Sequence, residues 1–249
     1  MRQLQTRHIL LFRILKDHCL FLTRPQIERV LTLATRLTNK QLRLLVAGNY
    51  LARRYRVDTF SHFQMPLYYL GTLGWHIVGN PMNRYKEYRR GIVERSDQQI
   101  EHDLTIYDVL VKFLLESAVK RIIKAEDALW QEPIGLGVIP DAWIQVDNQE
   151  AFIEVDLNTE GRAVVARKFD SYIKFQDSGG YERLFPGCHF KVLFVTATEE
   201  RIESLQQITT SDDIWFATIT EFLKEPVHHQ HWFALRGFYA LPDPEKKEV

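Results

Sequence analysis

Three carboxylates occur close together in the C-terminal half of the chain, within segments that otherwise have the composition of buried strands. Asp141 follows Pro140 in the segment VIPDAWIQV, and Glu154 and Asp156 lie two residues apart in AFIEVDL. Residues i and i+2 of a strand point to the same face of a sheet, so Glu154 and Asp156 are expected to project together. An unpaired charge is costly to bury, so these acids need a partner.

Carboxylate oxygens that converge from neighbouring strands are ligands that suit Mg²⁺ or Mn²⁺. An ion held by Asp141, Glu154 and Asp156 would clamp a phosphodiester and lower the pKa of an attacking water. In the alternative interpretation, the same acids lie at strand ends, where they are hydrated or paired with Lys168. The residue pattern leaves both interpretations open.

The surrounding apolar pattern predicts the elements that would position these acids. The continuous apolar run FKVLFVT is typical of a strand buried on both faces. The predicted order is αβββαβ, followed by one more helix and one more strand. The predicted ranges are Leu104–Val119, Arg121–Ala125, Val138–Val146, Ala151–Leu157, Arg162–Phe175 and Phe190–Thr196, then Glu199–Ile208 and Ile214–Ile219.

The net charge of zero conceals a strong polarity along the chain. Residues 1–95 contain 17 Lys/Arg and 5 Asp/Glu, a net charge of +12, whereas residues 96–249 contain 15 and 27, a net charge of −12. Opposite charges of this size favour two domains with different tasks. A basic domain suggests a polyanionic partner, most often nucleic acid, although an ordinary solvated surface is the alternative.

The basic half has the pattern of three helices followed by a β-hairpin. The first helix is predicted within residues 7–22, and Thr23 is the expected N-cap of the second. Thr38 and Gln41 form a T-x-x-Q capping box for the third helix, and Gly48 is its expected stop. Two strand-like runs follow at 50–57 and 66–70. This is the element order of a winged helix-turn-helix, whose third helix enters the major groove of DNA.

The predicted DNA contacts lie on the third helix, the first strand and the wing. Side chains of the third helix would face the bases, the strand arginines would flank phosphates, and the wing tip would reach the backbone or the minor groove. A basic hairpin that binds protein is the alternative. The predicted contact residues are Asn39, Lys40, Arg43, Arg53, Arg54, Arg56 and His62.

Short motifs of the second half resemble known families. Pro140-Asp141 followed by Glu154-Val155-Asp156 resembles the PD-(D/E)xK nuclease core, whose element order is also αβββαβ. The strings IPDA, FIEVDLNTE and KFDSY, with His102-Asp103-Leu104, resemble the replication-relaxation family of bacterial mobile elements. That resemblance implies a winged helix joined to a nuclease-like domain, with a role in DNA replication, relaxation or transfer.

The nuclease motif has a lysine two residues after the glutamate, to position water and stabilise negative charge. This chain has Asp156 at that position. The resemblance therefore implies either a degenerate core or a migrated lysine, for which Lys168 on the following helix is the first candidate. The catalytic set would then be Asp141, Glu154, Asp156 and Lys168.

The sequence thus predicts an α+β protein of two domains, with an N-terminal winged helix-turn-helix and a C-terminal α/β restriction-endonuclease-like core. The expected function is duplex-DNA binding, as an accessory or regulatory protein of a mobile element with a degenerate nuclease-like domain. The alternatives are an active Mg²⁺- or Mn²⁺-dependent endonuclease that nicks DNA, and a dimeric transcriptional repressor. The expected ranges are 1–80 for the winged helix, 81–100 for a basic linker, 101–241 for the nuclease-like domain and 242–249 for a disordered tail.

Double-stranded DNA is the expected partner, with a second copy of the chain and replication or transfer proteins as further options. No uncharged apolar run reaches the roughly 20 residues of a membrane helix. Arg7, Arg13 and Lys16 interrupt the apolar positions of the N-terminus, which argues against a signal peptide. The expected location is therefore the cytoplasm.

Overall fold

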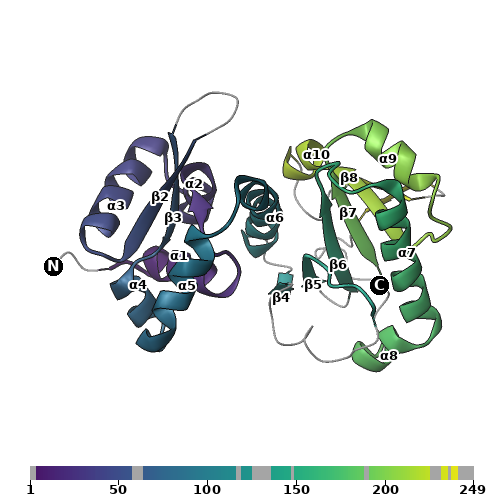
Figure 1. Cartoon of the computed structure of the whole chain (residues 1–249), viewed down its shortest axis with the longest axis horizontal. Coiled ribbons are helices and arrows are strands. Elements are labelled where there is room, and N and C mark those ends of the chain that lie inside the picture. Colours follow the sequence, from purple (N-terminus) through teal and green to yellow (C-terminus); the bar gives the residue numbers. More distant parts are fainter. Residues whose placement is uncertain are drawn as a thin grey trace, which may run out of the picture. The chain divides into compact units, whose positions relative to one another are not determined.

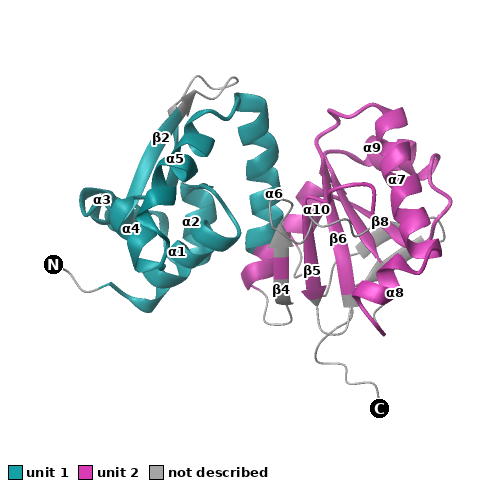
Figure 2. Cartoon of the chain, turned by 60° about the horizontal axis from the view of Figure 1, so that its bottom comes forward, with its two compact units in different colours: residues 1–111 teal, residues 112–249 magenta. Residues whose placement is uncertain are grey.

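The computed structural model of the 249-residue chain divides into two compact units, residues 1–111 and 112–249 (Figure 2). Both units contain helices and strands, so the fold is α+β. No helix within the described part of the chain is long and apolar enough to cross a membrane. The residues described are 4–57, 64–115, 119–124, 136–146, 149–187, 191–224, 231–234 and 237–240.

Unit 1 contains a three-stranded antiparallel sheet of order β1-β3-β2, and helices pack around this sheet (Figure 1). Its last helix, α6, runs across the boundary between the units. The elements are α1 (Thr6–Asp17), β1 (Leu22–Thr23), α2 (Arg24–Leu31), α3 (Thr35–Ala47), β2 (Leu51–Val57), β3 (Gln64–Leu70), α4 (Thr72–Ile77), the 3₁₀ helix η1 (Met82–Arg84), α5 (Tyr85–Val93) and α6 (Asp97–Leu115).

The N-terminus of α2 is fixed to α6 by one buried glutamine. Thr23 is the N-cap, as the sequence predicts, and Gln26 completes a capping box with it. The Gln26 Oε1 atom accepts hydrogen bonds from the Thr23 N–H at 2.8 Å and the Thr23 hydroxyl at 3.0 Å. The Gln26 amide group donates to the carbonyl of Leu104 in α6 at 2.9 Å. One side chain therefore satisfies polar groups of two helices.

Helix α3 begins earlier than its sequence predicts, so the proposed capping box at Thr38 and Gln41 is wrong. The N-cap is Ala34, and Thr38 lies inside the helix with a fully buried side chain. Its hydroxyl lies 3.3 Å from the carbonyl oxygens of both Leu33 and Ala34. Burying the i, i+4, i+7 face of the helix takes Thr38 into the core, where a carbonyl four residues back satisfies its hydroxyl. Gly48 ends the helix as expected.

The segment expected to be a basic linker, residues 81–100, forms η1, α5 and the first turn of α6. Ile92 of α5 is fully buried. The Tyr88 hydroxyl accepts a hydrogen bond from the Leu70 N–H at 3.1 Å and donates to the Leu20 carbonyl at 3.0 Å. These contacts attach α5 to the sheet of unit 1.

Unit 2 is built on a seven-stranded mixed sheet of order β10-β9-β8-β7-β6-β5-β4. Strands β6, β7 and β8 are parallel and the other pairs are antiparallel. From α6, which begins in unit 1, to β7 the elements follow the expected αβββαβ order, with the short helix α8 added between α7 and β7. The elements are β4 (Val119–Lys124), β5 (Ala142–Val146), β6 (Gln149–Asp156), α7 (Arg162–Asp177), α8 (Gly180–Leu184), β7 (Val192–Thr196), α9 (Glu199–Gln206), β8 (Ile214–Thr218), α10 (Ile219–Lys224), β9 (His231–Ala234) and β10 (Gly237–Ala240).

Aromatic side chains fill the space between the sheet and α7. Phe194 and Phe216 are paired residues of β7 and β8, and the ring of Phe169 from α7 lies 5.0 Å and 6.1 Å from theirs. Helices α7, α8 and α9 all contribute to this core. Glu154 is the register partner of Phe194, so a carboxylate lies on the same buried face. The expected tail, residues 242–249, lies outside the described residues.

The Gln26 contacts predict a cost for its truncation. Gln26→Ala removes three hydrogen bonds and leaves buried partners unsatisfied, so we expect the free energy of unfolding to fall by about 1–3 kcal/mol. Urea denaturation measures this change. Asn83→Ala, at an exposed position of η1, is the control and should change little. An unchanged midpoint for Gln26→Ala would contradict the role assigned to the glutamine.

Candidate functional site

Glu154 is a carboxylate in the interior of unit 2, with a side chain that is only 1% exposed. Its Oε2 atom accepts a hydrogen bond from the Lys168 ammonium group at 3.0 Å, and its Oε1 atom accepts one from the Tyr172 hydroxyl at 2.5 Å. Lys168 and Tyr172 lie four residues apart on α7, so one face of that helix presents both donors. Lys168 also contacts Glu160 at 3.1 Å.

Asp141 is next to Glu154 across the antiparallel pair of β5 and β6. Ala142 pairs with Ile153, and the register continued by one residue places Asp141 opposite Glu154. The Asp141 Oδ2 atom accepts a hydrogen bond from the Val155 N–H at 2.7 Å, which extends the ladder beyond the end of β5. The two acids that the sequence predicts to be neighbours are therefore neighbours in the fold.

Asp156 is also buried, at 3% exposed, but it has a different cation. Its Oδ2 atom lies 2.7 Å from both the Nε and the Nη2 atoms of Arg201 in α9. Its Oδ1 atom accepts a hydrogen bond from the Asn158 N–H at 2.9 Å. Arg201 also donates to the Glu160 carbonyl at 2.7 Å. Asp156 is thus held by an arginine, and Glu154 by a lysine.

Burial and the nearby Asp141 carboxylate raise the pKa of Glu154 to about 7, although Lys168 and Tyr172 oppose the shift. Burial alone would lower the pKa of Lys168, but its contacts with Glu154 and Glu160 raise that pKa above its ordinary value. Burial and the Glu154 charge raise the pKa of Tyr172 as well, so its hydroxyl keeps the proton that it donates. Lys168 is therefore a stable positive charge beside a carboxyl group that titrates near neutral pH.

Both carboxylate oxygens of Glu154 and of Asp156, and the Oδ2 atom of Asp141, already accept hydrogen bonds from protein groups. Lys168 and Arg201 supply positive charge beside Glu154 and Asp156, where a divalent ion would otherwise supply it. Within the described residues, no group of three or more His, Cys, Asp or Glu side chains is arranged to hold a metal ion. The donor set in this arrangement does not fit a divalent metal centre. Metal binding by Asp141, Glu154 and Asp156 stays a prediction, for which addition of Mn²⁺ is the test.

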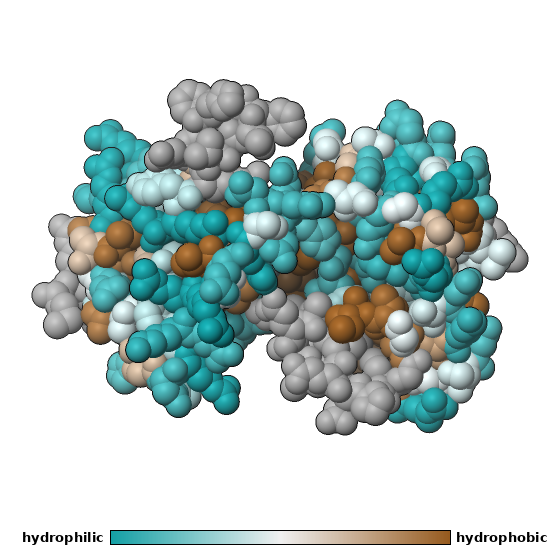
Figure 3. Space-filling model, viewed as in Figure 1, coloured by the Kyte–Doolittle hydropathy of each residue, from teal (hydrophilic) through white to brown (hydrophobic). Residues whose placement is uncertain are grey.

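The second candidate surface is the exposed face of α3 in unit 1. Lys40 and Arg43, both predicted DNA contacts, are exposed, and so is Arg36 one turn before Lys40. These three residues make no ion pair with any residue that the structure describes. Asn39 is half-buried at the edge of the same face. Figure 3 shows both hydrophilic and apolar surface on the side of unit 1 that carries α3.

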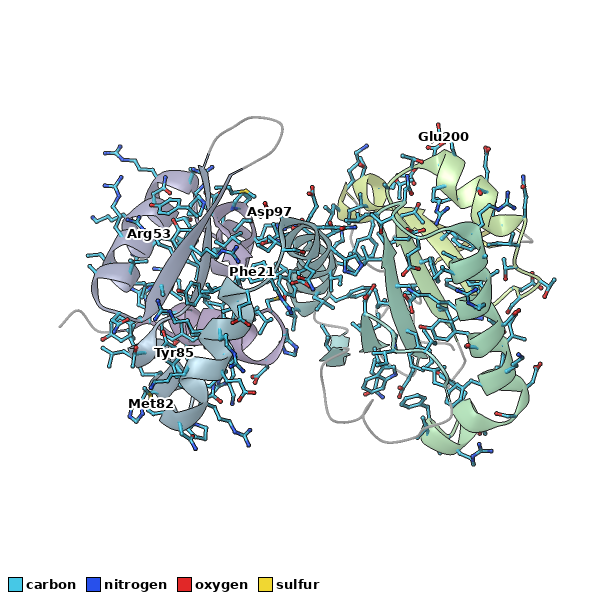
Figure 4. All side chains as sticks on the ribbon, in the orientation of Figure 1. Phe21, Arg53, Met82, Tyr85, Asp97 and Glu200 are labelled. Carbon is cyan, nitrogen blue, oxygen red and sulfur yellow. The ribbon has the colours of Figure 1, made fainter. Side chains whose placement is uncertain are left out.

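The predicted arginines of β2 have different surroundings. Arg53 is exposed and its guanidinium group lies 5.1 Å from the ring centroid of Tyr55 (Figure 4). Arg54 points to the other face of the sheet and donates to the Ile92 carbonyl at 2.6 Å and the Arg95 carbonyl at 3.4 Å. Ile92 lies in the last turn of α5 and Arg95 lies two residues after its end, so a cation at these carbonyls stabilises the helix C-terminus. Arg54 is therefore engaged within unit 1 rather than presented for phosphates.

The Arg56 side chain and His62 lie outside the described residues. Three residues of these surfaces were missed by the sequence reasoning: Arg36, Tyr172 and Arg201. Arg36 and Tyr172 each lie four residues from a predicted member, at Lys40 and Lys168, so helical spacing would have indicated them. Arg201 lies 45 residues after Asp156 in the chain, and no local spacing joins the two.

Comparison with known proteins gives one match. The model of the replication-relaxation family matches residues 12–187, which is more than half of the chain. No curated protein and no solved structure matches it.

The Lys168 contacts predict both a loss of stability and a gained response to metal. Lys168→Met leaves Glu154 buried without its cation, which costs about 3–5 kcal/mol for a fully buried pair. Lys168 is 23% exposed, so we expect the lower end of that range. Mn²⁺ should then raise the melting temperature of the variant, because binding to the folded state stabilises it, and should leave the wild type unchanged.

Calorimetry with and without Mn²⁺ measures both effects. Lys174→Met, at an exposed position of α7, is the matched control and should resemble the wild type. A melting temperature of the wild type that rises with Mn²⁺ would show that the acids bind a divalent ion despite Lys168 and Arg201.

The raised pKa of Glu154 predicts a pH dependence with a definite sign. A carboxyl group whose pKa is higher in the folded state binds more protons there, so its contribution to stability falls as pH rises from about 4.5 to about 7. Glu154→Gln removes this group, so we expect a weaker fall over that window. Urea denaturation at several pH values measures the slope, and Glu203→Gln, at an exposed position of α9, should keep the wild-type slope.

Proposed function

The chain belongs to the replication-relaxation family, and we propose that it binds duplex DNA as an accessory or regulatory protein in the replication, relaxation or transfer of a mobile element. The exposed basic face of α3, with Arg36, Lys40 and Arg43, is the observation that carries this proposal. Unit 1 contains 17 Lys/Arg and 9 Asp/Glu, a net charge of +8, which favours a polyanionic partner.

We propose that the first part of unit 1, from α1 to β3, is a winged helix-turn-helix. Its three helices precede the β2–β3 hairpin, and the short β1 completes the sheet beside β3. In this arrangement α3 is the recognition helix, which lies in the major groove with its N-terminal residues at the base edges. Arg53 of β2 is exposed and is proposed to contact a phosphate.

We propose that unit 2 is a degenerate PD-(D/E)xK nuclease core that takes part in DNA processing without cutting DNA. The adjacent Asp141 and Glu154 support the relationship to that core, and so does the order of β4, β5, β6, α7 and β7 after α6, to which only the short α8 is added. Asp156 occupies the position where the motif has lysine, and Arg201 holds its carboxylate. This arrangement supports the loss of catalytic function in the core. The unit would then act through its shape and contacts rather than through hydrolysis.

An active endonuclease is the second candidate, and the 3.0 Å contact between Lys168 and Glu154 favours it. A migrated lysine beside the glutamate would restore the missing cation of the motif. Its chemistry would be hydrolysis of a phosphodiester, with Asp141 and Glu154 as the acidic residues and Lys168 stabilising negative charge. A dimeric repressor, and contacts with replication or transfer proteins, stay predictions.

DNA binding and nicking can be measured together on supercoiled plasmid and on short duplexes with Mg²⁺ or Mn²⁺. We expect a gel shift that weakens with salt and no nicked product. Replacing Arg36, Lys40 and Arg43 with alanine, one at a time, should weaken binding. The plot of log K against log salt has a negative slope. Each variant that loses a phosphate contact should make that slope shallower by about one unit.

The matched control is Arg167→Ala, which removes an exposed arginine of unit 2 and should leave binding unchanged. Arg53→Ala should weaken binding evenly across duplex sequences. Absent or salt-independent binding of the wild type would overturn the proposal for unit 1. Nicking by the wild type that Lys168→Met abolishes would establish the endonuclease instead of the degenerate core.

A further inference from the structure

The outward face of α3 is divided lengthwise into a cationic and an apolar stripe. At 100° per residue, Arg36, Lys40 and Arg43 lie within about 60° of one another around the helix axis. Leu37 and Leu44 lie beside them, about 40–60° beyond Lys40. Leu37 is 50% exposed and Leu44 is 40% exposed, although Leu42 and Leu45 of the same helix are buried in the core. Leu37 and Leu44 therefore leave apolar surface outside the core, beside the cations.

A cationic stripe beside an apolar one matches the chemistry of the major groove. The groove is bordered by phosphates, and its floor presents one apolar group, the C5-methyl of thymine. Apolar side chains of recognition helices contact that methyl group, whereas cations contact guanine or phosphate. Leu37 is the third residue of α3, and N-terminal residues of such a helix approach the base edges most closely.

We propose that Leu37 reads thymine in the major groove, with the neighbouring Arg36 and Lys40 holding the helix in register on the DNA. The proposal rests on the proposed function of unit 1 as a duplex-DNA binder and adds the base that its recognition helix selects. The apolar stripe could also pack against another protein. The charges beside it favour DNA, because three exposed cations at a protein interface would need acidic partners.

Deoxyuridine tests this inference, because it keeps the base pair of thymidine and lacks only the methyl group. Duplexes that bind the wild type are first enriched from a random-sequence library made with thymidine. The tightest duplex is then synthesised with deoxyuridine at each thymidine in turn, and fluorescence anisotropy gives the dissociation constants. At one position we expect about fourfold weaker binding by the wild type, which corresponds to one buried methyl group.

Leu37→Ala should bind the thymidine duplex more weakly and should no longer distinguish deoxyuridine from thymidine at that position. A double-mutant cycle measures this coupling directly. Leu44→Ala makes the same chemical change seven residues further along the same stripe, about 10.5 Å away along the helix. This matched control should retain the full discrimination.

The outcomes separate this inference from the proposed function. Coupling of Leu37, and not of Leu44, to a single thymine methyl supports the inference. Enriched duplexes without a common thymine, equal affinity for deoxyuridine, or discrimination that survives Leu37→Ala would each overturn it. In all three cases DNA binding remains intact. A wild type that binds no duplex at all would instead overturn the proposed function.

Discussion

The cost of burying carboxylates in a sheet governs the arrangement of unit 2. Glu154 and Asp156 face the helical layer of the domain, where an uncompensated charge would destabilise the fold by several kcal/mol. Each acid therefore needs a cation from a helix that covers that face, and Lys168 and Arg201 supply it from α7 and α9. The site, the packing of both helices and the pH response of Glu154 all follow from this requirement, because the same groups that neutralise the acids also hold the helices against the sheet.

A second requirement, that the carbonyl groups at a helix C-terminus find donors, explains why not every predicted arginine of unit 1 is presented on the surface. Arg53 and Arg54 are adjacent in sequence and point to opposite faces of the sheet, because side chains alternate along a strand. Arg54 donates to the carbonyl groups of Ile92 and Arg95 at the C-terminal end of α5, which need a donor. The Arg53 side chain lies against the Tyr55 ring and is exposed. The net charge of a segment indicates the sign of charge on the partner that it attracts. The face of the sheet on which each arginine lies determines whether a partner can contact that arginine.

Local pattern was sufficient to predict most of the elements and the pairing of Asp141 with Glu154. The strand segments around both acids are short and apolar, and a hairpin places them next to each other whatever the rest of the chain does. Two features depended on distant residues and were not predictable in this way. Thr38 lies inside α3 rather than at its N-cap, because the core of unit 1 requires that face of the helix. Arg201 contacts Asp156 because the crossover through α7 places β7 beside β6, and α9, which carries Arg201, follows β7.

The distribution of charge between the units limits where DNA affinity can arise. Residues 112–249 contain 15 Lys/Arg and 23 Asp/Glu, a net charge of −8, so unit 2 as a whole repels a polyanion. A divalent ion would offset part of that repulsion at an active nuclease centre, but Lys168 and Arg201 already neutralise the buried acids from within. Their charges are used in the interior and are not offered to phosphates. In the proposed function, the attraction to DNA would therefore come mainly from the basic face of unit 1, because the net charge of unit 2 opposes it.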